Sequence, residues 1–353
     1  MKVAITADIH LSTDQEYPER FNALTNILDQ LVKEKINNLI IAGDLFDAKS
    51  QNYSIFDDLC KKEQYNKIIF HIIPGNHDPV ISKKYFSADN VKIYNQPSFL
   101  SFKDCAFRFF FVPYIPGRSM GEVIAKQKEN IPERWVLIGH GDYISGIREP
   151  NTYEKGIYMP LGRSDIEYYN PSTVILGHIH KKMQIGRVYY PGSPCGMDIN
   201  ETGRRTYFVL DLNDLSILER EVNTDYIFFN EDIVVYPTSD EFEDIENKIK
   251  KMIDGWDLGK EEIEKARIRL RVRGYTSDKN RLYNLLKESL RDFSFYNGEE
   301  PDIGEVSLFN DPERASIVER VERKIDQAQK EGNLPDLKKE MILEKALAII
   351  LKE

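Results

Sequence analysis

Over the first 215 residues, short runs of consecutive apolar residues alternate with stretches in which apolar residues recur every three or four positions. A short continuous run is typical of a strand buried on both faces, and the second spacing is typical of an amphipathic helix. The pattern predicts an α/β domain whose helices cover both faces of the sheets. The clearest helical stretch holds Phe21, Leu24, Ile27, Leu28, Leu31 and Val32. The predicted strands are Val3–Thr6, Leu39–Ala42, Ile68–Ile73, Phe107–Val112, Trp135–Ile138, Thr173–Leu176, Arg187–Tyr190 and Thr206–Leu212.

The pattern changes after about residue 225. Glu241–Met252 and Lys279–Arg291 have the spacing of amphipathic helices, and Ala266–Arg273 alternates like a strand, which predicts a small α+β unit. After Pro301 two further helices are expected, Glu313–Lys330 and Asp336–Lys352, separated by a segment with Gly and Pro at the usual boundary positions. We therefore predict three regions, 1–224, 225–300 and 301–353.

Composition narrows the class of protein. The 353 residues carry 48 Lys and Arg against 58 Asp and Glu, a net charge of −10, which argues against a surface coated in positive charge. Cys60, Cys105 and Cys195 are odd in number and widely spaced, which disfavours a disulfide framework and favours a reducing compartment. No apolar run reaches the ~18 residues of a membrane span. We expect no cleaved signal peptide, because the candidate site begins at Asp8. We expect a cytoplasmic protein with no membrane partner; nucleoid association and a phage origin stay open.

Five short motifs follow predicted strands and contain five of the six histidines. In open α/β sheets, ligands bind at the carboxyl ends of strands. One such motif is a weak signal, but five in order are not expected of structural histidines. The sixth histidine, His71, lies inside a strand, and we expect it to be a core or supporting residue. The motifs are Asp8-Ile9-His10, Gly43-Asp44-Leu45-Phe46-Asp47, Gly75-Asn76-His77-Asp78, Gly139-His140-Gly141-Asp142 and Gly177-His178-Ile179-His180.

The spacing and chemistry of these motifs indicate a metal site. Residues two apart in an extended segment point to the same side, so Asp8 and His10 can share one centre, and His178 and His180 can reach one pocket. Two or three carboxylates, one amide oxygen and four of the five imidazoles of these motifs form a donor set for two first-row divalent ions, with Asp44 as the natural bridge. No thiolate is among them, which disfavours a structural zinc site. The neighbouring glycines are expected to allow sharp turns and the approach of a substrate phosphate.

The motifs, in this order, resemble those of the calcineurin-like metallophosphoesterase superfamily, and most of all its SbcD-type nuclease subunits of DNA double-strand-break repair complexes. The resemblance is strong over the first ~215 residues. It implies a four-layer sandwich of two sheets flanked by helices (1–224), a small α+β capping domain that contacts DNA (225–300) and a C-terminal helical hairpin (301–353). The stretches that carry it are Ile41–Asp47, Ile73–Asp78, Leu176–His180 and Tyr190–Pro194.

The resemblance also implies a role for each motif residue. His77 would face the scissile phosphate as a catalytic residue rather than a ligand. Two Mn²⁺ ions would be the usual cofactors, with Mg²⁺, Fe²⁺ or Zn²⁺ as substitutes. The first ion would be held by Asp8, His10, Asp44 and His180, and the second by Asp44, Asn76, His140 and His178.

Asp47 is a departure from the resemblance, because nuclease members often carry His at this position. An ionised carboxylate would repel a phosphate unless it touched a metal or an arginine. This departure bears on the details of an exonuclease activity. It does not change the expectation that the protein hydrolyses phosphoesters with metal ions. We expect Asp47 and Asp78 to support the ligands or to handle the phosphate.

A second candidate feature is an alternating strand in the capping region. Period two places its four arginines on one face, with apolar residues on the other. One interpretation is a row of contacts to the DNA backbone. The other is a solvated sheet face paired with the acidic run Asp240–Glu246. The arginines are Arg267, Arg269, Arg271 and Arg273.

The C-terminal helices are unusually apolar. They either fold back on their own domain or dock on helices of a partner. The resemblance favours docking on the coiled-coil base of an SbcC-like ATPase. It also implies a homodimer through Tyr53–Cys60 and Val80–Phe86, which the sequence alone describes as a surface helix and a loop.

These observations lead to one expected function and two alternatives. The expected function is a manganese-dependent nuclease, an exonuclease on double-stranded ends and an endonuclease on single strands, in a complex with an SbcC-like ATPase. The first alternative is a phosphoesterase of small nucleotides or phosphomonoesters. The second is a non-catalytic metal-binding scaffold for the ATPase.

Overall fold

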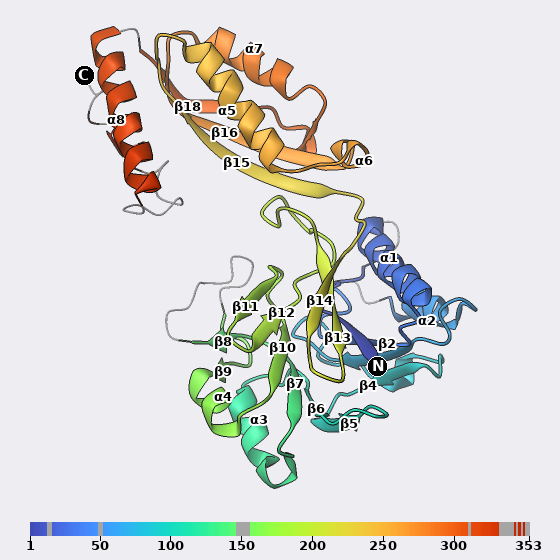
Figure 1. The fold of residues 1–353 in the computed structure, drawn as a ribbon. Coiled ribbons are helices and arrows are strands. Elements are labelled where there is room, and N and C mark those ends of the chain that lie inside the picture. The colour runs from blue at the N-terminus through green and yellow to red at the C-terminus, as the bar shows by residue number, and fades with distance from the viewer. Residues whose placement is uncertain are drawn as a thin grey trace. The chain divides into compact units, whose positions relative to one another are not determined.

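The computed structural model describes residues 1–12, 16–48, 52–145, 156–309 and 312–331, with 342, 343, 345, 346 and 349. The chain divides into two compact units (Figure 1). The first comprises Met1–Gly196 and Arg204–Asp225, and the second comprises Met197–Gly203 and the residues from Tyr226 onward. None of the described helices has the length and apolar character needed to span a membrane.

The first unit contains two six-stranded mixed sheets. In the first sheet β1, β2, β3 and β4 are parallel, and β13 and β14 complete it with antiparallel pairings. In the second sheet β6, β7, β10 and β12 are parallel, with antiparallel edge strands β5 and β11. The first sheet runs β14(Ile217–Glu221)-β13(Thr206–Asp211)-β1(Lys2–Thr6)-β2(Asn38–Ala42)-β3(Ile69–Ile73)-β4(Val91–Ile93). The second runs β11(Met183–Ile185)-β12(Val188–Tyr190)-β10(Thr173–Gly177)-β7(Trp135–His140)-β6(Arg108–Val112)-β5(Ser98–Ser101).

The two sheets face one another across an apolar core, which includes Val3, Ile40, Phe109 and Ile138. The outer face of the first sheet packs against α1 (Pro18–Glu34) and α2 (Tyr53–Lys61). The outer face of the second packs against α3 (Met120–Lys126) and α4 (Arg163–Tyr169). The unit is thus a four-layer sandwich of two sheets flanked by helices, as predicted. Its remaining elements are η1 (Lys83–Tyr85), η2 (Lys128–Asn130) and a short pair of strands, β8 (Tyr143–Ile144) and β9 (Leu161–Gly162).

The second unit is built on a parallel sheet with β16 at its centre. Its strands are β15 (Ile227–Val235), β16 (Ala266–Thr276), β17 (Ser294–Phe295) and β18 (Asp302–Leu308). The helices α5 (Glu241–Gly255) and α7 (Lys279–Ser289) cover one face with a shared apolar core. The other elements are α6 (Lys260–Ile263), η3 (Tyr296–Gly298) and α8 (Pro312–Lys330). The segment Asp302–Leu308, which the sequence placed in the helical region, is therefore a strand of this sheet.

The C-terminal region packs in part on its own unit. Ile325 of α8 and Leu343 are buried in a small apolar cluster with Val234 and Tyr236. Val234 pairs with Arg273 across β15 and β16, so this cluster lies on the same face of the sheet as the arginines. The predicted helix Asp336–Lys352 lies mostly outside the described residues, and the five that are described are helical.

Candidate metal centre

The five motifs meet where parallel strands of both sheets end. Asp8 and His10 follow β1, Asp44 follows β2, and Asn76 and His77 follow β3 in the first sheet. In the second sheet His140 is the last residue of β7, and His178 and His180 follow β10. Because these strands are parallel within each sheet, their carboxyl ends share an edge, and the motif side chains from both sheets are brought together there.

Three overlapping groups of side chains place their ligand atoms within 4.8 Å of one another. Asp8, His10 and Asp44 each belong to two of the groups, so the three groups form one connected set. His10 Nε2 lies 3.2 Å from His180 Nε2 and 3.7 Å from Asp44 Oδ2. The groups are Asp8, His10 and His180; His10, Asp44 and His77; and Asp8, Asp44 and His140.

Asn76 joins His178, the one candidate ligand histidine outside these groups, to the cluster through His140. Its Oδ1 lies 2.8 Å from His140 Nε2 and 3.1 Å from His178 Nδ1. His140 Nε2 is also 3.3 Å from Asp44 Oδ2. All seven residues proposed as ligands from the sequence therefore belong to one connected cluster.

Four of these residues hold the backbone in the left-handed region. Their φ angles are 54° at Asp8, 50° at His10, 50° at Asp44 and 103° at His178. Such conformations are uncommon for residues with a side chain and concentrate at functional sites, where the surrounding structure enforces them. The strain supports a binding role for this cluster.

Two glycines of the motifs lie so close to candidate ligand side chains that a larger residue would clash with them. A Cβ on Gly43, whose φ is +93°, would lie 2.1 Å from His140 Nδ1, and a Cβ on Gly75 would lie 2.0 Å from Asp44 Oδ1. The space beside these two glycines is thus filled by candidate ligands. Our expectation that they admit a substrate phosphate is wrong at these positions.

The cluster is electrostatically coupled. Burial raises the pKa of Asp8 to about 6, against the opposing charges of His140 and His180. Burial also acts to raise the pKa of Asp44, but the charge and hydrogen bond of His140 outweigh it and hold that pKa well below its ordinary value. Burial lowers the pKa of His10 well below 6.5, which leaves its ring neutral.

The donor set fits divalent cations. The Ala42 carbonyl can only accept, so His140 Nδ1 donates to it at 2.9 Å. His140 Nε2 then faces the oxygens of Asn76 and Asp44. Burial lowers the pKa of His140, yet the Asp44 charge raises it overall to about 10, so this position attracts a positive charge. A metal ion would supply that charge among oxygen and imidazole ligands.

His77 lies within the same cluster. Its ring packs edge-on against His10 with centroids 4.6 Å apart, and its backbone N–H donates to Asp44 Oδ1 at 2.8 Å. The backbone contact fixes the position of the residue independently of its ring. The side chain is half-buried.

The two supporting carboxylates have different partners. Asp47 Oδ2 accepts from Arg20 Nη1 at 3.3 Å, and the same nitrogen donates to the His10 carbonyl at 2.8 Å. This arginine is the kind of partner that the sequence analysis required for a carboxylate near a phosphate. Asp78 is fully buried and accepts from the backbone of Gly75 at 2.7 Å and of Phe46 at 3.2 Å, so it joins two site loops. Burial, reinforced by the Asp44 charge, raises the pKa of Asp78 to about 7.

Sequence reasoning missed Arg20 and a second buried arginine, Arg205. Arg205 donates to the Ser193 carbonyl at 3.0 Å, to Ser193 Oγ at 2.8 Å and to the His180 carbonyl. It therefore fixes the loop that presents His180. The stretch Tyr190–Pro194, which contains Ser193 and carries part of the family resemblance, is the sequence feature that could have pointed to this loop.

The four arginines of β16 share one face, as predicted, because alternate residues of this strand are buried against α5 and α7. Their partners differ from the expected acidic run. Arg269 pairs with Glu299 through two hydrogen bonds of 2.8 and 2.6 Å, and Arg271 pairs with Asp232 through two of 2.8 Å. The run Asp240–Glu246 lies at the start of α5, which covers the opposite face.

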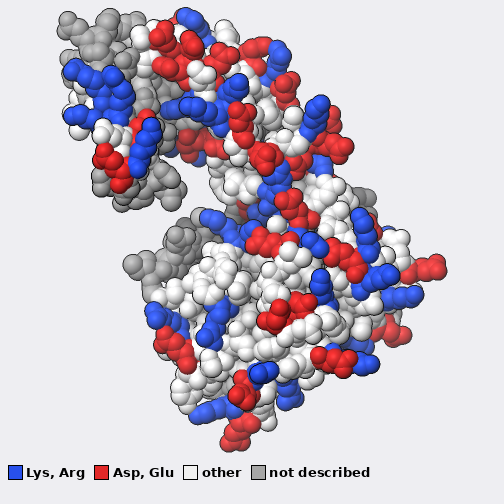
Figure 2. Space-filling view, viewed as in Figure 1, with Lys and Arg blue, Asp and Glu red and all other residues white. Residues whose placement is uncertain are grey.

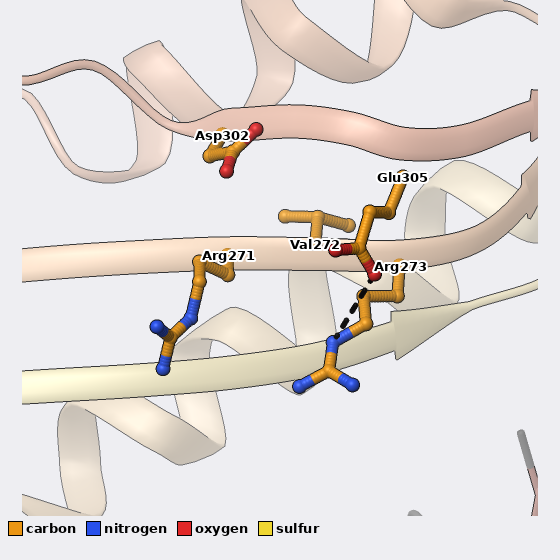
Figure 3. Close-up of a pocket in the computed structure, with 5 residues that line it drawn as sticks. All are labelled: Arg271, Val272, Arg273, Asp302 and Glu305. Carbon is orange, nitrogen blue, oxygen red and sulfur yellow. Dashed lines mark ion pairs between the residues drawn. The ribbon is translucent and has the colours of Figure 1, made fainter.

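The end of this face is hollowed. Figure 3 shows Arg271 and Arg273 projecting side by side from β16, with Glu305 3.8 Å from Arg273 Nε. The hollow of about 290 Å³ is also lined by Asp302. In the view of Figure 2, acidic and basic side chains are interspersed over both units rather than gathered into one basic patch. The first arginine of the strand, Arg267, donates to the backbone carbonyls of Glu264 and Ala266.

Comparison with known proteins places this site in a family. Residues 1–182, just over half of the chain, match the family model of calcineurin-like phosphoesterases. The chain belongs to this family, whose members are metal-dependent hydrolases.

The chain is also similar to two curated proteins, at low sequence identity. The chain is 26% identical over 212 residues to an uncharacterized metallophosphoesterase, YhaO, of Bacillus subtilis, a match that covers 55% of this chain and 50% of YhaO. It is 27% identical over 242 residues to the DNA double-strand break repair protein Mre11 of Saccharolobus solfataricus, covering 60% of this chain and 61% of Mre11. The chain thus spans between half and three-fifths of these relatives.

Among solved structures, TT1561 of Thermus thermophilus matches 63% of this chain and 99% of its own, with 13% identity and a TM-score of 0.40.

Proposed function

We propose that this protein is a two-metal DNA nuclease of the SbcD type. The observation that carries the proposal is the convergence of seven carboxylate, amide and imidazole side chains from five motifs at the strand ends of two sheets. Asp8, His10, Asp44 and His180 would hold one ion, and Asp44, Asn76, His140 and His178 the other. The ions we propose are Mn²⁺, the usual ions of the nucleases that the motifs resemble.

When bound, such a pair of ions provides Lewis-acid stabilisation of a phosphate and activates water. The protein's own contribution is to fix the ligands and to manage protons. His10, kept neutral by burial, keeps a lone pair available to a cation. We propose that His77 protonates the leaving oxygen or stabilises charge on the phosphate; its backbone contact to Asp44 and its half-buried ring beside His10 support this role.

DNA is favoured over a small nucleotide by two features. One is the similarity to a relative named for DNA double-strand break repair. The other is the second unit, whose arginine face offers guanidinium donors to phosphates. A phosphoesterase of small nucleotides would need no such unit. The intact His77 argues against a purely structural metal site.

The partners are proposed on the same basis. We propose that the C-terminal region docks on an SbcC-like ATPase, because Ile317 of α8 is 40% exposed and Ile349 is 79% exposed. We also propose a homodimer through α2 and the segment Val80–Phe86, where Val80 is 65% exposed. The cytoplasm is the proposed location.

An assay on end-labelled DNA tests the substrate. Duplex and single-stranded oligonucleotides are incubated with Mn²⁺ and then with a chelator, beside thymidine monophosphate as a small phosphomonoester. We expect Mn²⁺-dependent cleavage of DNA and little release of phosphate from the mononucleotide. The reverse preference would establish the small-nucleotide alternative, and no hydrolysis of either would favour the scaffold.

A further inference from the structure

Two buried arginines donate to the backbone carbonyls of two candidate ligands. Arg20 Nη1 donates to the His10 carbonyl at 2.8 Å, and Arg205 Nη2 donates to the His180 carbonyl. Arg20 is 7% exposed and Arg205 is 8% exposed, so both side chains are almost fully buried. The two histidines belong to one candidate metal group, with Asp8, and their Nε2 atoms lie 3.2 Å apart. Both arginines therefore hold the backbone of the same candidate metal position.

Arg20 reaches His10 from the first turn of α1. His10 holds a φ of 50°, and its N–H donates to the Asp44 carbonyl at 3.0 Å, so Arg20 holds the other polar group of a strained residue. The guanidinium is itself anchored, because Nη1 also donates to Asp47 at 3.3 Å and Cζ lies 4.2 Å from the centre of the Tyr17 ring. The His10 carbonyl is thus fixed to a helix.

Arg205 lies directly before β13 and reaches the loop that carries His180. Its Nε donates to the Ser193 carbonyl at 3.0 Å, and its Nη2 donates to Ser193 Oγ at 2.8 Å. The Ser193 N–H donates to the His180 carbonyl at 3.0 Å, so the serine and the arginine converge on one oxygen. Because β13 lies inside the first sheet, Arg205 fixes the His180 loop to a rigid element.

The charge of the two guanidinium groups opposes the binding of a cation nearby, because like charges repel more strongly where water is excluded. What an arginine offers at these positions is a planar fork of N–H donors, which fixes an oxygen in place. Hydrogen bonds from charged donors are among the strong ones in proteins. Groups that orient metal ligands typically change metal affinity by about 10- to 100-fold. Geometry and charge therefore predict effects of opposite sign.

We infer that Arg20 and Arg205 are positioning residues for the first of the two metal positions. They hold the backbones of His10 and His180 so that both rings face one ion. This inference rests on the proposed two-metal function. The second position depends on them less, because His140 is the last residue of β7 and its ring donates to the Ala42 carbonyl. The alternative is that the two arginines serve only the general stability of the domain.

The test is a titration of metal-free protein with Mn²⁺, followed by electron paramagnetic resonance, which distinguishes a single Mn²⁺ from a coupled pair. In Arg20→Gln and in Arg205→Gln, one ion should bind about 10- to 100-fold more weakly and the other as in wild type. The signal of the coupled pair should appear only at correspondingly higher Mn²⁺. Adding His178→Ala, which removes a ligand of the second position, should abolish the remaining tight ion.

Two kinds of variant serve as controls. Arg20→Lys and Arg205→Lys keep the charge and lose the fork, so they should weaken the same ion. Arg187 lies at the amino end of β12, the end opposite the cluster, and donates to the Pro171 carbonyl at 2.7 Å. Arg187→Gln loses a similar bond and should keep both affinities. Urea denaturation in a chelator reports folding, and Arg20→Gln decides alone should Arg205→Gln fail to fold.

Three results would overturn the inference. Tighter Mn²⁺ binding by the glutamine variants would show that charge dominates, equal weakening of both ions would show a general loss of structure, and unchanged binding would show no role. The titration does not depend on the substrate. If the wild type binds two ions but cleaves no DNA, the nuclease proposal fails, while the titration still decides the role of the two arginines.

Discussion

At the scale of a single residue, a substitution of His77 tests catalysis separately from metal binding. Its backbone, rather than its ring, is bonded to Asp44, so removal of the ring leaves that contact in place. We predict that His77→Ala keeps both metal ions and loses turnover of bis-p-nitrophenyl phosphate by about 10²–10⁴-fold, the range of general acid catalysis. Metal content is measured on the same sample. A collapse of metal content would show that His77 is itself a ligand.

His71 provides a pH prediction away from the metal cluster. Its ring is buried between Tyr94 and Asn38, with hydrogen bonds of 3.0 Å to each, as expected of a core histidine. Burial lowers its pKa from 6.5 to about 4. The unfolded chain therefore binds the proton more readily, so stability is fully present above pH 6.5 and falls as pH decreases toward 4.

The matched variant is His71→Gln, which stays neutral. Between pH 7 and pH 4.5 the wild type should lose about 2–3 kcal/mol more of its free energy of unfolding than the variant, measured by urea denaturation in a chelator. Parallel pH curves would mean that His71 is protonated equally in both states.

At the scale of elements, the predictable features were those with a local sequence pattern. Eight strands of the first unit were found because their apolar runs are continuous, and the site followed because each motif comes after such a run. The short edge strands β4, β5 and β11 and the exposed strand β14 were not predicted. β18 was missed because Val306 is its one buried hydrophobic residue, and α3 and α4 were missed because each has only seven residues. Arg20 and Arg205 bind backbone carbonyls, contacts that no residue pattern reveals.

The arginine face of β16 was predicted correctly as a face, but its carboxylate partners lie far away in sequence. Because Asp232 holds both Arg271 and Arg273, it competes with phosphate for them. We predict that Asp232→Asn tightens DNA binding, and that the double variant Arg271→Gln/Arg273→Gln weakens it and flattens the salt dependence by about one unit of slope per lost contact. Binding is measured by fluorescence anisotropy between 50 and 200 mM salt. Unchanged slopes in both variants would leave the face as an ion-paired surface.

At the scale of the whole molecule, the C-terminal region divides into a buried and an exposed part. Ile325 belongs to the cluster with Val234, whereas Ile317 and Ile349 are exposed. We predict that Ile317→Ser/Ile349→Ser loses co-purification with an SbcC-like ATPase but keeps hydrolysis of bis-p-nitrophenyl phosphate. The control Ile325→Ser should instead destabilise the second unit, because it leaves a polar group and a cavity in an apolar cluster. Undiminished co-purification of the double variant would refute the docking surface.

The central claim is a pair of metal ions that share Asp44. The most direct measurement is the number of Mn²⁺ ions bound per chain after equilibrium dialysis, for wild type and for Asp44→Ala. The account predicts two ions for the wild type, at most one for the variant, and no turnover of bis-p-nitrophenyl phosphate by the variant. Two ions and full turnover in Asp44→Ala would contradict it.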